Sequence, residues 1–422
     1  MTFPQDTQPR PSANRSLGDT QDSRVKLYSA EFAADPHAAY REMRQRYGSL
    51  VPVEIYPGVP ATLVIGYHTA IEILQDNNNR FSADPRRWQT SVRSDCPILP
   101  MVEWRPNALR SDGVEHHRYR KATNDALEGV DQHDLHDMVE RAAASLVAAF
   151  PTTGSEPERT ADLITTYIQP LVFMVLNEIL GCPPEIGAAI AAASAALFDS
   201  TDTETVNAMF DDAFLRLVKL KRAEPGDDVA TRLVQHAAGL SDHELIHQFV
   251  TCFSAGMEPG QNLITNTLVL ILTDSRFDGS GSGFIPTSTA VDEILAMDPP
   301  LANYCITYPL QPIQVAGVWL PADQPVITSM AACSNDPQIN TGDYSRNGWN
   351  LGWGAGPHQC PQHARSAAYR IAVDAIDQLL DAVPELRLAV PAQDLQWRPG
   401  GFHRSLVALP VVFPAAAPPI ST

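Results

Sequence analysis

The stretch "GWGAGPHQCPQHARSAAYR", residues 352–370, surrounds a single cysteine, Cys360, with glycines, a proline and a histidine. A helical pattern follows directly, with Pro361 at its first position. Three interpretations are open for such a segment. The first is a surface turn in which the cysteine has no role. The second is a glycine-rich loop that binds phosphate, and the third is a loop that presents a thiolate ligand to a large, flat cofactor.

The residue types around Cys360 bear on each interpretation. A phosphate-binding P-loop ends in Gly-Lys-Ser/Thr, and this segment has no lysine. Glycines let the backbone approach a cofactor closely because they carry no Cβ. A helix that begins after the sulfur directs free N–H groups at it, which favours a thiolate. Pro361 loses no hydrogen bond at the first helical position. The sequence of the loop alone does not exclude the interpretation as a surface turn.

Composition limits the class of protein. A chain of 422 residues with 44% hydrophobic residues can form one large domain or two. A net charge of −19 without a block of Lys and Arg argues against nucleic acid as a partner. Residues 1–24 are polar and proline-rich, which predicts a disordered lead and no signal peptide, and no apolar run is long enough to cross a membrane. The six cysteines lack CxxC pairs and zinc spacing, as is typical of unbridged thiols in the cytoplasm.

Hydrophobic periodicity predicts a mainly helical chain with small β-sheets. A hairpin is expected over 52–67, with its turn at Pro57-Gly58. The longest predicted helix, 241–274, opens with Ser241 and Glu244 at capping-box spacing and is apolar on most faces. Further helices are expected over 35–48, 68–76, 114–150, 159–180, 184–198, 203–223, 228–238, 288–298 and from the Cys360 loop to about 383, and short strands within 299–333, 386–390 and 406–413. This order predicts an α+β fold and not a doubly wound sheet.

Five motifs in order along residues 25–413 resemble a bacterial cytochrome P-450. The haem loop of that family reads Phe-x-x-Gly-x-x-x-Cys-x-Gly, and Trp353, Gly356 and Cys360 stand at this spacing, with Gln362 in place of the last glycine. The other four are "SDGVEHHRYRKATNDAL" (111–127), "SAGMEPGQN" (254–262), "AACSNDP" (331–337) and "WRPGGFHRSLVALPVVF" (397–413). The resemblance implies the cytochrome P-450 fold, a helical bundle around a buried haem b, as a single domain over 25–422.

The resemblance also implies which residues bind the cofactor. Cys360 would be the thiolate ligand of the iron, which favours cleavage of the O–O bond. His116 and Arg120 lie one helical turn apart on one face and would contact a haem propionate, and His358 would reach a propionate from the loop. Solvent-facing histidines are the alternative for His116 and His358. The residues assigned to the cofactor are His116, Arg120, Trp353, Gly354, His358 and Cys360.

The chain departs from the family pattern at two arginines. The Glu-x-x-Arg motif appears as residues 293–296 without its arginine, so Glu293 needs another partner. Arg346 is the partner that we expect, with simple solvent exposure of Arg346 as the alternative. The arginine that usually binds the second propionate is also absent, and Thr307 or Tyr308 stands in that region. Haem contacts would therefore depend more on the assigned histidines and on the helical arginine.

A third departure lies in the long helix. The distal threonine of the family is Pro259, which cannot donate a hydrogen bond and frees the carbonyl of Ala255. With Gly256 and Gly260 beside it, a kink over the haem is expected. Glu258 keeps the acid position, where it relays protons together with water or substrate, or forms an ordinary ion pair. The residues assigned to catalysis are Gly256, Glu258 and Pro259.

The resemblance implies a haem-thiolate oxidase or monooxygenase of specialised metabolism, a monomer that activates dioxygen with electrons from a ferredoxin and its reductase. The missing distal alcohol favours oxidative coupling of an aromatic small molecule through a C–C or C–N bond, for example in a tryptophan- or tyrosine-containing cyclodipeptide or peptide. Hydroxylation of a natural product stays open. So does a catalytically silent haem-binding protein, which the losses of arginine and threonine favour.

Two further surfaces follow from this interpretation. Substrate contacts are expected from the irregular segment 82–110, from the helix at 251–261 and from the C-terminal hairpin, with core packing as the alternative for each aromatic residue. The residues assigned to the substrate pocket are Trp88, Met101, Trp104, Ala255, Phe402 and His403. A basic patch for the ferredoxin is expected from Arg118, Lys121, Arg365 and Arg370.

Overall fold

The computed structural model describes residues 15–16, 24–76, 79–150, 158–198, 203–277, 285–340, 342, 344 and 349–414. The predicted lead over 1–24 lies outside the described residues, apart from Arg24 and a two-residue strand β1 (Arg15–Ser16). Strand β1 pairs in parallel with β9 (Val318–Leu320). That residues 25–422 form a single domain stays a prediction.

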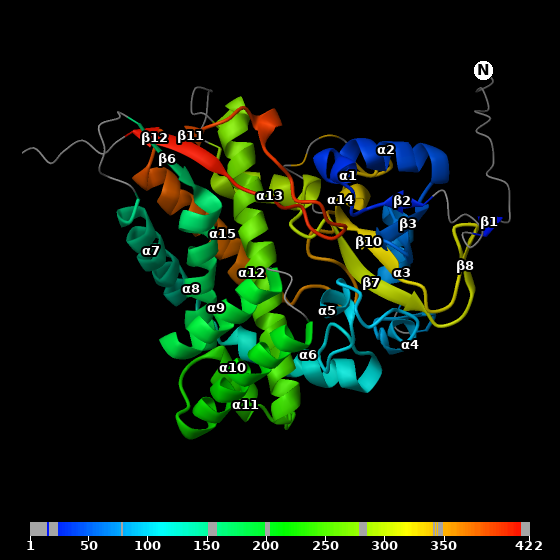
Figure 1. Ribbon diagram of the computed structural model, residues 1–422, viewed down its shortest axis with the longest axis horizontal. Coiled ribbons are helices and arrows are strands. Elements are labelled where there is room, and N and C mark those ends of the chain that lie inside the picture. Colours follow the sequence, from blue (N-terminus) through cyan, green and yellow to red (C-terminus); the bar gives the residue numbers. More distant parts are fainter. Residues whose placement is uncertain are drawn as a thin grey trace, which may run out of the picture.

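Helices form the larger part of the molecule, on the left of Figure 1, as the hydrophobic periodicity predicts. The long helix α12 (Asp242–Thr273) runs through this part and packs against its neighbours on several sides. These neighbours are α8 (Gln169–Leu180), α10 (Thr203–Ala223), α13 (Thr287–Met297) and α15 (Gln362–Ala382). The remaining large helices are α6 (Gly113–Glu128), α7 (Gln132–Ala148), α9 (Pro184–Phe198) and α11 (Val229–Gln235).

The main sheet lies on the other side of the molecule (Figure 1). Its order is β2 (Val25–Lys26), β3 (Leu50–Tyr56), β4 (Val59–Val64), β10 (Val326–Ser329), β7 (Asn303–Pro309) and β5 (Phe81–Ser82). There are two small sheets among the described residues. One has the order β1, β9 and β8 (Ile313–Val315). The other has the order β11 (Arg387–Leu388), β12 (Pro410–Pro414) and β6 (Glu158–Asp162). Short helices α1 (Ala30–Ala34), α2 (Pro36–Tyr47), α3 (Tyr67–Leu74), α4 (Arg86–Gln89), α5 (Leu99–Val102) and α14 (Met330–Ser334) accompany the sheets. The predicted α+β fold with small sheets is confirmed.

Local signals for two elements are also confirmed. The β3–β4 hairpin turns at Gly58, whose φ of 78° is the left-handed conformation that glycine adopts readily. Ser241 caps α12, its side chain accepting from the Glu244 backbone N–H while the Glu244 side chain accepts from the Ser241 backbone N–H. This reciprocal pair is a capping box. Among the described helices, none combines the length and hydropathy needed to cross a membrane.

Helix α12 continues through Pro259 without a break, and a kink at this residue stays a prediction. Proline in a helix interior removes one hydrogen bond. Helix α12 packs against the four neighbouring helices, and Phe249 and Phe253 of α12 contact Phe214 of α10. Tertiary burial therefore outweighs the local preference of proline to end the helix.

The structure corrects two predicted helices. The helix expected over 114–150 is two helices, because Asp131 caps α7 by accepting from the backbone N–H groups of His133 and Asp134. The helix expected over 159–180 begins as strand β6, which pairs antiparallel with β12, and continues through a π-helical turn at Ile164–Ile168. The partner strand lies some 250 residues away in sequence, so the local pattern carries no signal for this pairing.

Candidate functional site

The Cys360 loop is held by its own backbone. The N–H of Cys360 donates to the carbonyl of Trp353 at 2.9 Å, and the N–H of Gly354 donates to the carbonyl of Leu351 at 2.8 Å. Gly356 has a φ of 73°, and a Cβ at this position would lie 1.9 Å from the carbonyl oxygen of Leu74. No side chain fits there. The loop therefore needs glycine both for its conformation and for its close approach to α3.

Burial dominates the ionisation of Cys360 in the protein without metal. It raises the pKa of the thiol to about 11, and the positive charges of Arg120 and Arg365 only partly oppose this rise. Among the protein groups, burial therefore outweighs the features of the loop that favour a thiolate. A metal ion would supply the missing stabilisation, since thiolate ligands lose their proton when the metal binds.

The structure brings the predicted residues of α6 and the loop together. The rings of His116 and His358 have centroids 4.3 Å apart, and His116 is 4% exposed. Arg120 donates from Nη2 to the carbonyl of Gln359 at 2.6 Å, directly beside Cys360. The alternative of solvent-facing histidines is thus excluded for His116, which is buried, while His358 is only partly exposed.

The protein groups around His116 and His358 favour the neutral form of both imidazoles at pH 7. Burial, together with the nearby charges of His358 and Arg120, lowers the pKa of His116 to about 4. Burial likewise lowers the pKa of His358, whose Nε2 donates to the carbonyl of Ser111 at 3.0 Å. The ring of His116 bonds the carbonyl of Pro357. Each ring already has one carbonyl partner, so a carboxylate at its other nitrogen would require the imidazolium form.

Three observations show that these residues fit a haem. Nε2 of His116 is buried without a hydrogen-bond partner among the described residues, as is Oγ1 of Thr307 on β7. The loop is shaped by glycines against α3 and presents a thiol. In the middle of α12, Ser254 and Ala255 are exposed although Phe253 and Met257 beside them are buried. An exposed position within a central helix indicates a cavity on that side of α12.

Of the residues assigned to catalysis, Gly256 has a packing role. A Cβ on Gly256 would lie 3.0 Å from Cδ2 of Leu176, so glycine lets α12 approach α8 closely. Glu258 accepts from Nη1 of Arg398 at 3.1 Å, and its other oxygen lies 3.8 Å from Nε2 of His403. Glu258 is therefore in an ion pair with the C-terminal segment, which was the alternative to a proton relay.

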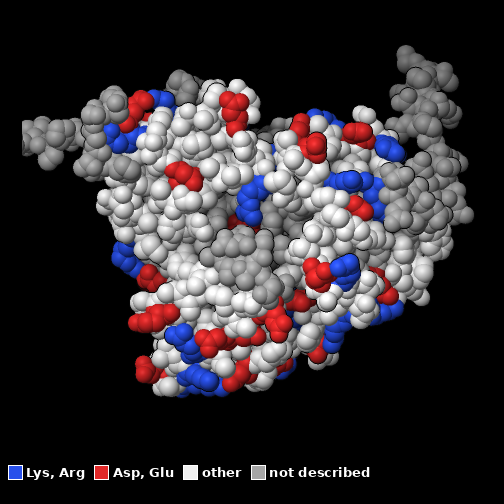
Figure 2. Space-filling model, viewed as in Figure 1, with Lys and Arg blue, Asp and Glu red and all other residues white. Residues whose placement is uncertain are grey.

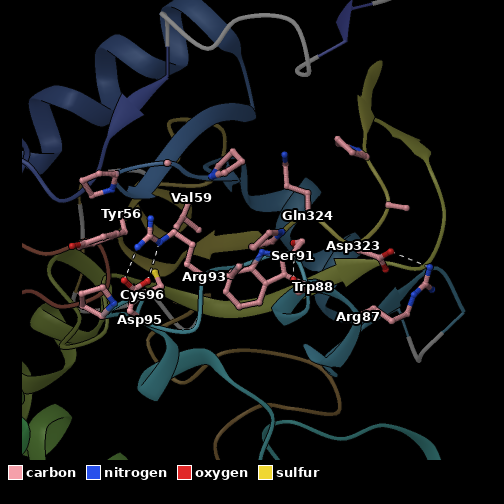
Figure 3. Close-up of a pocket in the computed structure, with 18 residues that line it drawn as sticks. Tyr56, Val59, Arg87, Trp88, Ser91, Arg93, Asp95, Cys96, Asp323 and Gln324 are labelled. Carbon is pink, nitrogen blue, oxygen red and sulfur yellow. Dashed lines mark hydrogen bonds and ion pairs between the residues drawn. The ribbon is translucent and has the colours of Figure 1, made fainter. Parts of the chain in front are cut away.

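Trp88 lies apart from α12. It is 5% exposed, packs on Tyr308 with ring centroids 5.7 Å apart, and lines a surface pocket of about 800 Å³ (Figure 3). The β3–β4 turn, the segment after α4 and the residues before β10 form this pocket. Trp104 is half-buried under the guanidinium of Arg86, 4.8 Å from its ring centroid. Within the described residues, no hydrogen bond, ion pair or ring contact joins either aromatic side chain to the exposed part of α12.

Tyr304 on β7 connects two other predicted pocket residues. Its ring meets that of Phe402 edge-on at 5.8 Å, and its hydroxyl donates to the carbonyl of Met101 at 3.2 Å. Arg110 donates from Nη2 to that same carbonyl and to the Tyr304 hydroxyl, at 2.6 Å each. Sequence reasoning missed Tyr304 and Arg110. The only signal was the position of Arg110, directly before the motif over 111–127.

The partner of Glu293 corrects a further expectation. Arg276, in the turn after α12, donates from Nη1 and Nη2 to the two carboxylate oxygens of Glu293 at 3.0 and 2.7 Å. Glu293 is 3% exposed, so this two-pronged pair satisfies a buried charge. Arg346, the expected partner, lies outside the described residues.

Comparisons with known proteins give the family. No family model matches the chain. It is 30% identical over 398 residues to the cytochrome P-450 monooxygenase PikC of Streptomyces venezuelae, across 90% of this chain and 92% of that protein. It is 28% identical over 417 residues to the vitamin D(3) 25-hydroxylase of Pseudonocardia autotrophica, across 94% and 98%. The solved structure of CYP154C4 from Streptomyces sp. W2061 superposes with a TM-score of 0.79 at 25% identity, across 92% and 97%. The chain belongs to the cytochrome P-450 family of haem-binding oxidoreductases.

Proposed function

We propose that Cys360 is the thiolate ligand of the haem iron and that α12 covers the opposite face of the haem. The observation that carries this proposal is the meeting of Cys360, Arg120, His116 and His358 at one end of the cavity. When bound, a haem-thiolate supplies the chemistry that activates dioxygen. The task of this chain is to hold the cofactor, order the substrate and bring protons to the site.

Arg120 is the residue best placed to hold a propionate on the Cys360 side. Its guanidinium stays charged and one of its nitrogens is fixed by the Gln359 carbonyl, so its other N–H groups are positioned beside the loop. His116 and His358 would join it in the imidazolium form. A propionate between them would offset the burial that lowers the pKa of both rings.

The substrate that we propose is an aromatic small molecule. Tyr304 and Phe402 provide an edge-to-face pair near Met101, and aromatic rings recognise one another in this geometry. Ser254 and Ala255 are the residues of α12 that would contact the substrate, because they are exposed in the middle of that helix. The relatives are named for different substrates, vitamin D(3) and 2-hydroxy-5-methyl-1-naphthoate among them, so they do not single out one substrate for this chain.

Oxidative coupling is the reaction that we favour over hydroxylation. Pro259 offers no hydroxyl, and Glu258 is engaged with Arg398, so protein groups on α12 give dioxygen limited proton delivery. In coupling, the substrate loses two hydrogen atoms and gains one C–C or C–N bond. Dioxygen, two electrons and two further protons then complete two molecules of water. A phenol or indole can bring an N–H or O–H group of its own to order water in the cavity.

Labelled dioxygen separates the two reactions. The purified protein would be incubated with a ferredoxin, its reductase, NADPH, ¹⁸O₂ and tryptophan- or tyrosine-containing cyclodipeptides, and the products analysed by mass spectrometry. A product two hydrogens lighter without ¹⁸O supports coupling. A product with one ¹⁸O establishes hydroxylation instead. A substrate that shifts the haem spectrum but yields neither product, also with peroxide as oxidant, indicates a silent haem-binding protein.

The electron donor that we propose is a ferredoxin that docks near Arg365, on the Cys360 side. The other basic residues expected there are neutralised by carboxylates: Arg118 by Glu244, Lys121 by Asp125 and Arg370 by Asp374. Lys and Arg are likewise mixed with Asp and Glu over the face shown in Figure 2. Arg365 has no ion-pair partner within the described parts of the chain. A reduction rate that is independent of salt and of Arg365→Glu would contradict this docking site.

A further inference from the structure

Arg110 lies in the short connection between α5 and α6 and is 3% exposed. Its Nη2 donates to the carbonyl of Met101 and to the hydroxyl of Tyr304, and its guanidinium lies 5.4 Å from the Tyr304 ring centroid. Within the described residues no carboxylate pairs with Arg110, and Nε and Nη1 have no acceptor. Buried charges are normally paired, so this guanidinium is incomplete without a further partner.

The charge of Arg110 acts on groups from both sides of the cavity. Burial raises the pKa of Cys305 to about 12, and Arg110 opposes that rise. The same charge opposes the burial-induced rise in the pKa of Tyr308. Cys305 and Tyr308 belong to β7, and Ser111, the residue after Arg110, accepts a hydrogen bond at its carbonyl from Nε2 of His358 in the Cys360 loop at 3.0 Å. Arg110 therefore lies within electrostatic reach of the place where β7 meets the loop.

A β-bulge in β7 explains how Tyr304 comes to face Arg110. Tyr304 pairs with Thr328 and Ile306 with Ile327, which leaves Cys305 as the extra residue, with a φ of 35°. A bulge changes the direction of the side chains on either side of it. Thr307, two residues further on, occupies the region where the family has its second propionate-binding arginine, and its buried hydroxyl has no partner among the described residues.

We propose that Arg110 binds the haem propionate on the β7 side and thereby takes the part of the arginine that is missing near Thr307. The inference rests on the placement of haem over Cys360 proposed above. A propionate is a carboxylate that the bound cofactor always brings, and it would complete the pairing that the chain itself leaves open at Nε and Nη1. A carboxylate on a substrate has the same chemistry and is the alternative that the experiment separates.

The first measurement is the rate at which the holoenzyme loses haem to excess apomyoglobin. Arg110→Met keeps much of the side-chain length but removes the charge and the donors, and haem release should become about tenfold faster. Arg105→Met is the matched control. Arg105 belongs to the same connection and already has Glu103 and Asn207 as partners, so its loss should leave haem release unchanged. Far-UV circular dichroism confirms that both variants are folded.

Two further measurements exclude a merely structural effect. The propionate bending bands in the resonance Raman spectrum should move in Arg110→Met and stay in place in Arg105→Met. Adding Thr307→Arg to Arg110→Met should restore slow haem release, because it returns an arginine to the β7 side. Unchanged release together with unchanged bands would overturn the proposal.

The source of the carboxylate is tested with indole-3-propionate and its methyl ester. If Arg110→Met leaves haem release unchanged but abolishes binding of the acid and not of the ester, Arg110 serves a substrate, and the proposal is overturned in favour of that role. The proposal that Cys360 binds the iron is tested by a different result from the one that tests Arg110. A wild-type protein without the thiolate-type carbon monoxide band contradicts Cys360 as ligand, whereas a wild type with the band and an Arg110→Met variant with normal haem retention contradicts this inference alone.

Discussion

The Cys360 loop and helix α12 face the proposed haem from opposite sides and depart from the family pattern to different extents. The loop keeps the glycine, histidine and cysteine spacing, and its form is fixed by backbone contacts such as that between Gly356 and Leu74. Helix α12 has replaced the distal threonine with Pro259 and has engaged Glu258 with Arg398. The loop is constrained because a backbone that approaches this closely tolerates no added atoms.

The difference separates two requirements of a haem enzyme. We propose that retention of the cofactor depends on the loop, on α6 and on Arg110. In the same proposal, the outcome of the reaction depends on α12, whose side chains would contact the substrate and the water around it. A chain can change the second set while the first stays intact. Variants in the loop should therefore affect haem content and spectrum, and variants in α12 should affect turnover of a protein that still holds haem.

The largest expected effect is that of Cys360→Ala, which should abolish the red-shifted Soret band of the reduced carbon monoxide complex or remove haem altogether. The control is Cys305→Ala, because Sγ of Cys305 lies against the Cys360 loop, 3.2 Å from the position of a Cβ on Gly354. Cys305→Ala should keep the band. A band that survives in Cys360→Ala and disappears in Cys305→Ala would move the ligand to β7.

Gly356→Ala tests the shape of the loop without touching the sulfur. Its Cβ would meet the Leu74 carbonyl at 1.9 Å in a left-handed conformation, so the free energy of unfolding should fall by about 3 kcal/mol, with loss of haem. Gly58→Ala is the matched control. Gly58 has a similar φ of 78° with no atom within 4 Å of its Cβ position, so only the backbone term of about 1 kcal/mol remains. Chemical denaturation measures both, and equal losses would contradict the close approach.

Glu258→Gln decides between a proton relay and an ion pair. We expect the ion pair, so Glu258→Gln should lower stability and reduce turnover by less than about fivefold, with haem content and spectrum unchanged. Arg398→Gln breaks the same pair of 3.1 Å and should give a similar loss of stability. Chemical denaturation and steady-state rates of product formation give the answer. If Glu258→Gln lowers turnover about 10²-fold while Arg398→Gln retains most of it, Glu258 is a positioned acid.

These regions also differ in how far the sequence predicts them. The capping box of Ser241 and Glu244 and the turn of helix between His116 and Arg120 are local, so spacing alone reveals them. The pairing of Glu293 with Arg276 is nearly local, yet the family pattern directed attention to Arg346 instead. Spacing shows which residues share a helix face but not which distant strand or loop lies opposite.

Long-range contacts supply the rest of the site. Arg110 and Tyr304 are 194 residues apart, and they meet only because a bulge in β7 turns Tyr304 toward the α5–α6 connection. Strand β6 exists because β12 offers it a partner. The ionisation of Cys360 likewise depends on how deeply the folded chain buries the sulfur, which outweighs the helix end that the sequence shows. Such effects arise from the assembled fold and leave no mark on local patterns.

Pro259→Thr should have the smallest effect on product formation. It changes α12 alone and leaves the Cys360 loop, on the other side of the proposed haem, as it is. Helix α12 is already continuous through Pro259, so the threonine N–H can donate to the carbonyl of Ala255 within the existing helix. If the substrate orders the water that delivers protons, product formation should change by less than about threefold. Wild-type turnover with peroxide as oxidant is the control, because that route bypasses proton delivery to dioxygen. A tenfold gain in ferredoxin-driven product, with less peroxide released, would show instead that proton delivery limits the natural protein and that Pro259 is the cause.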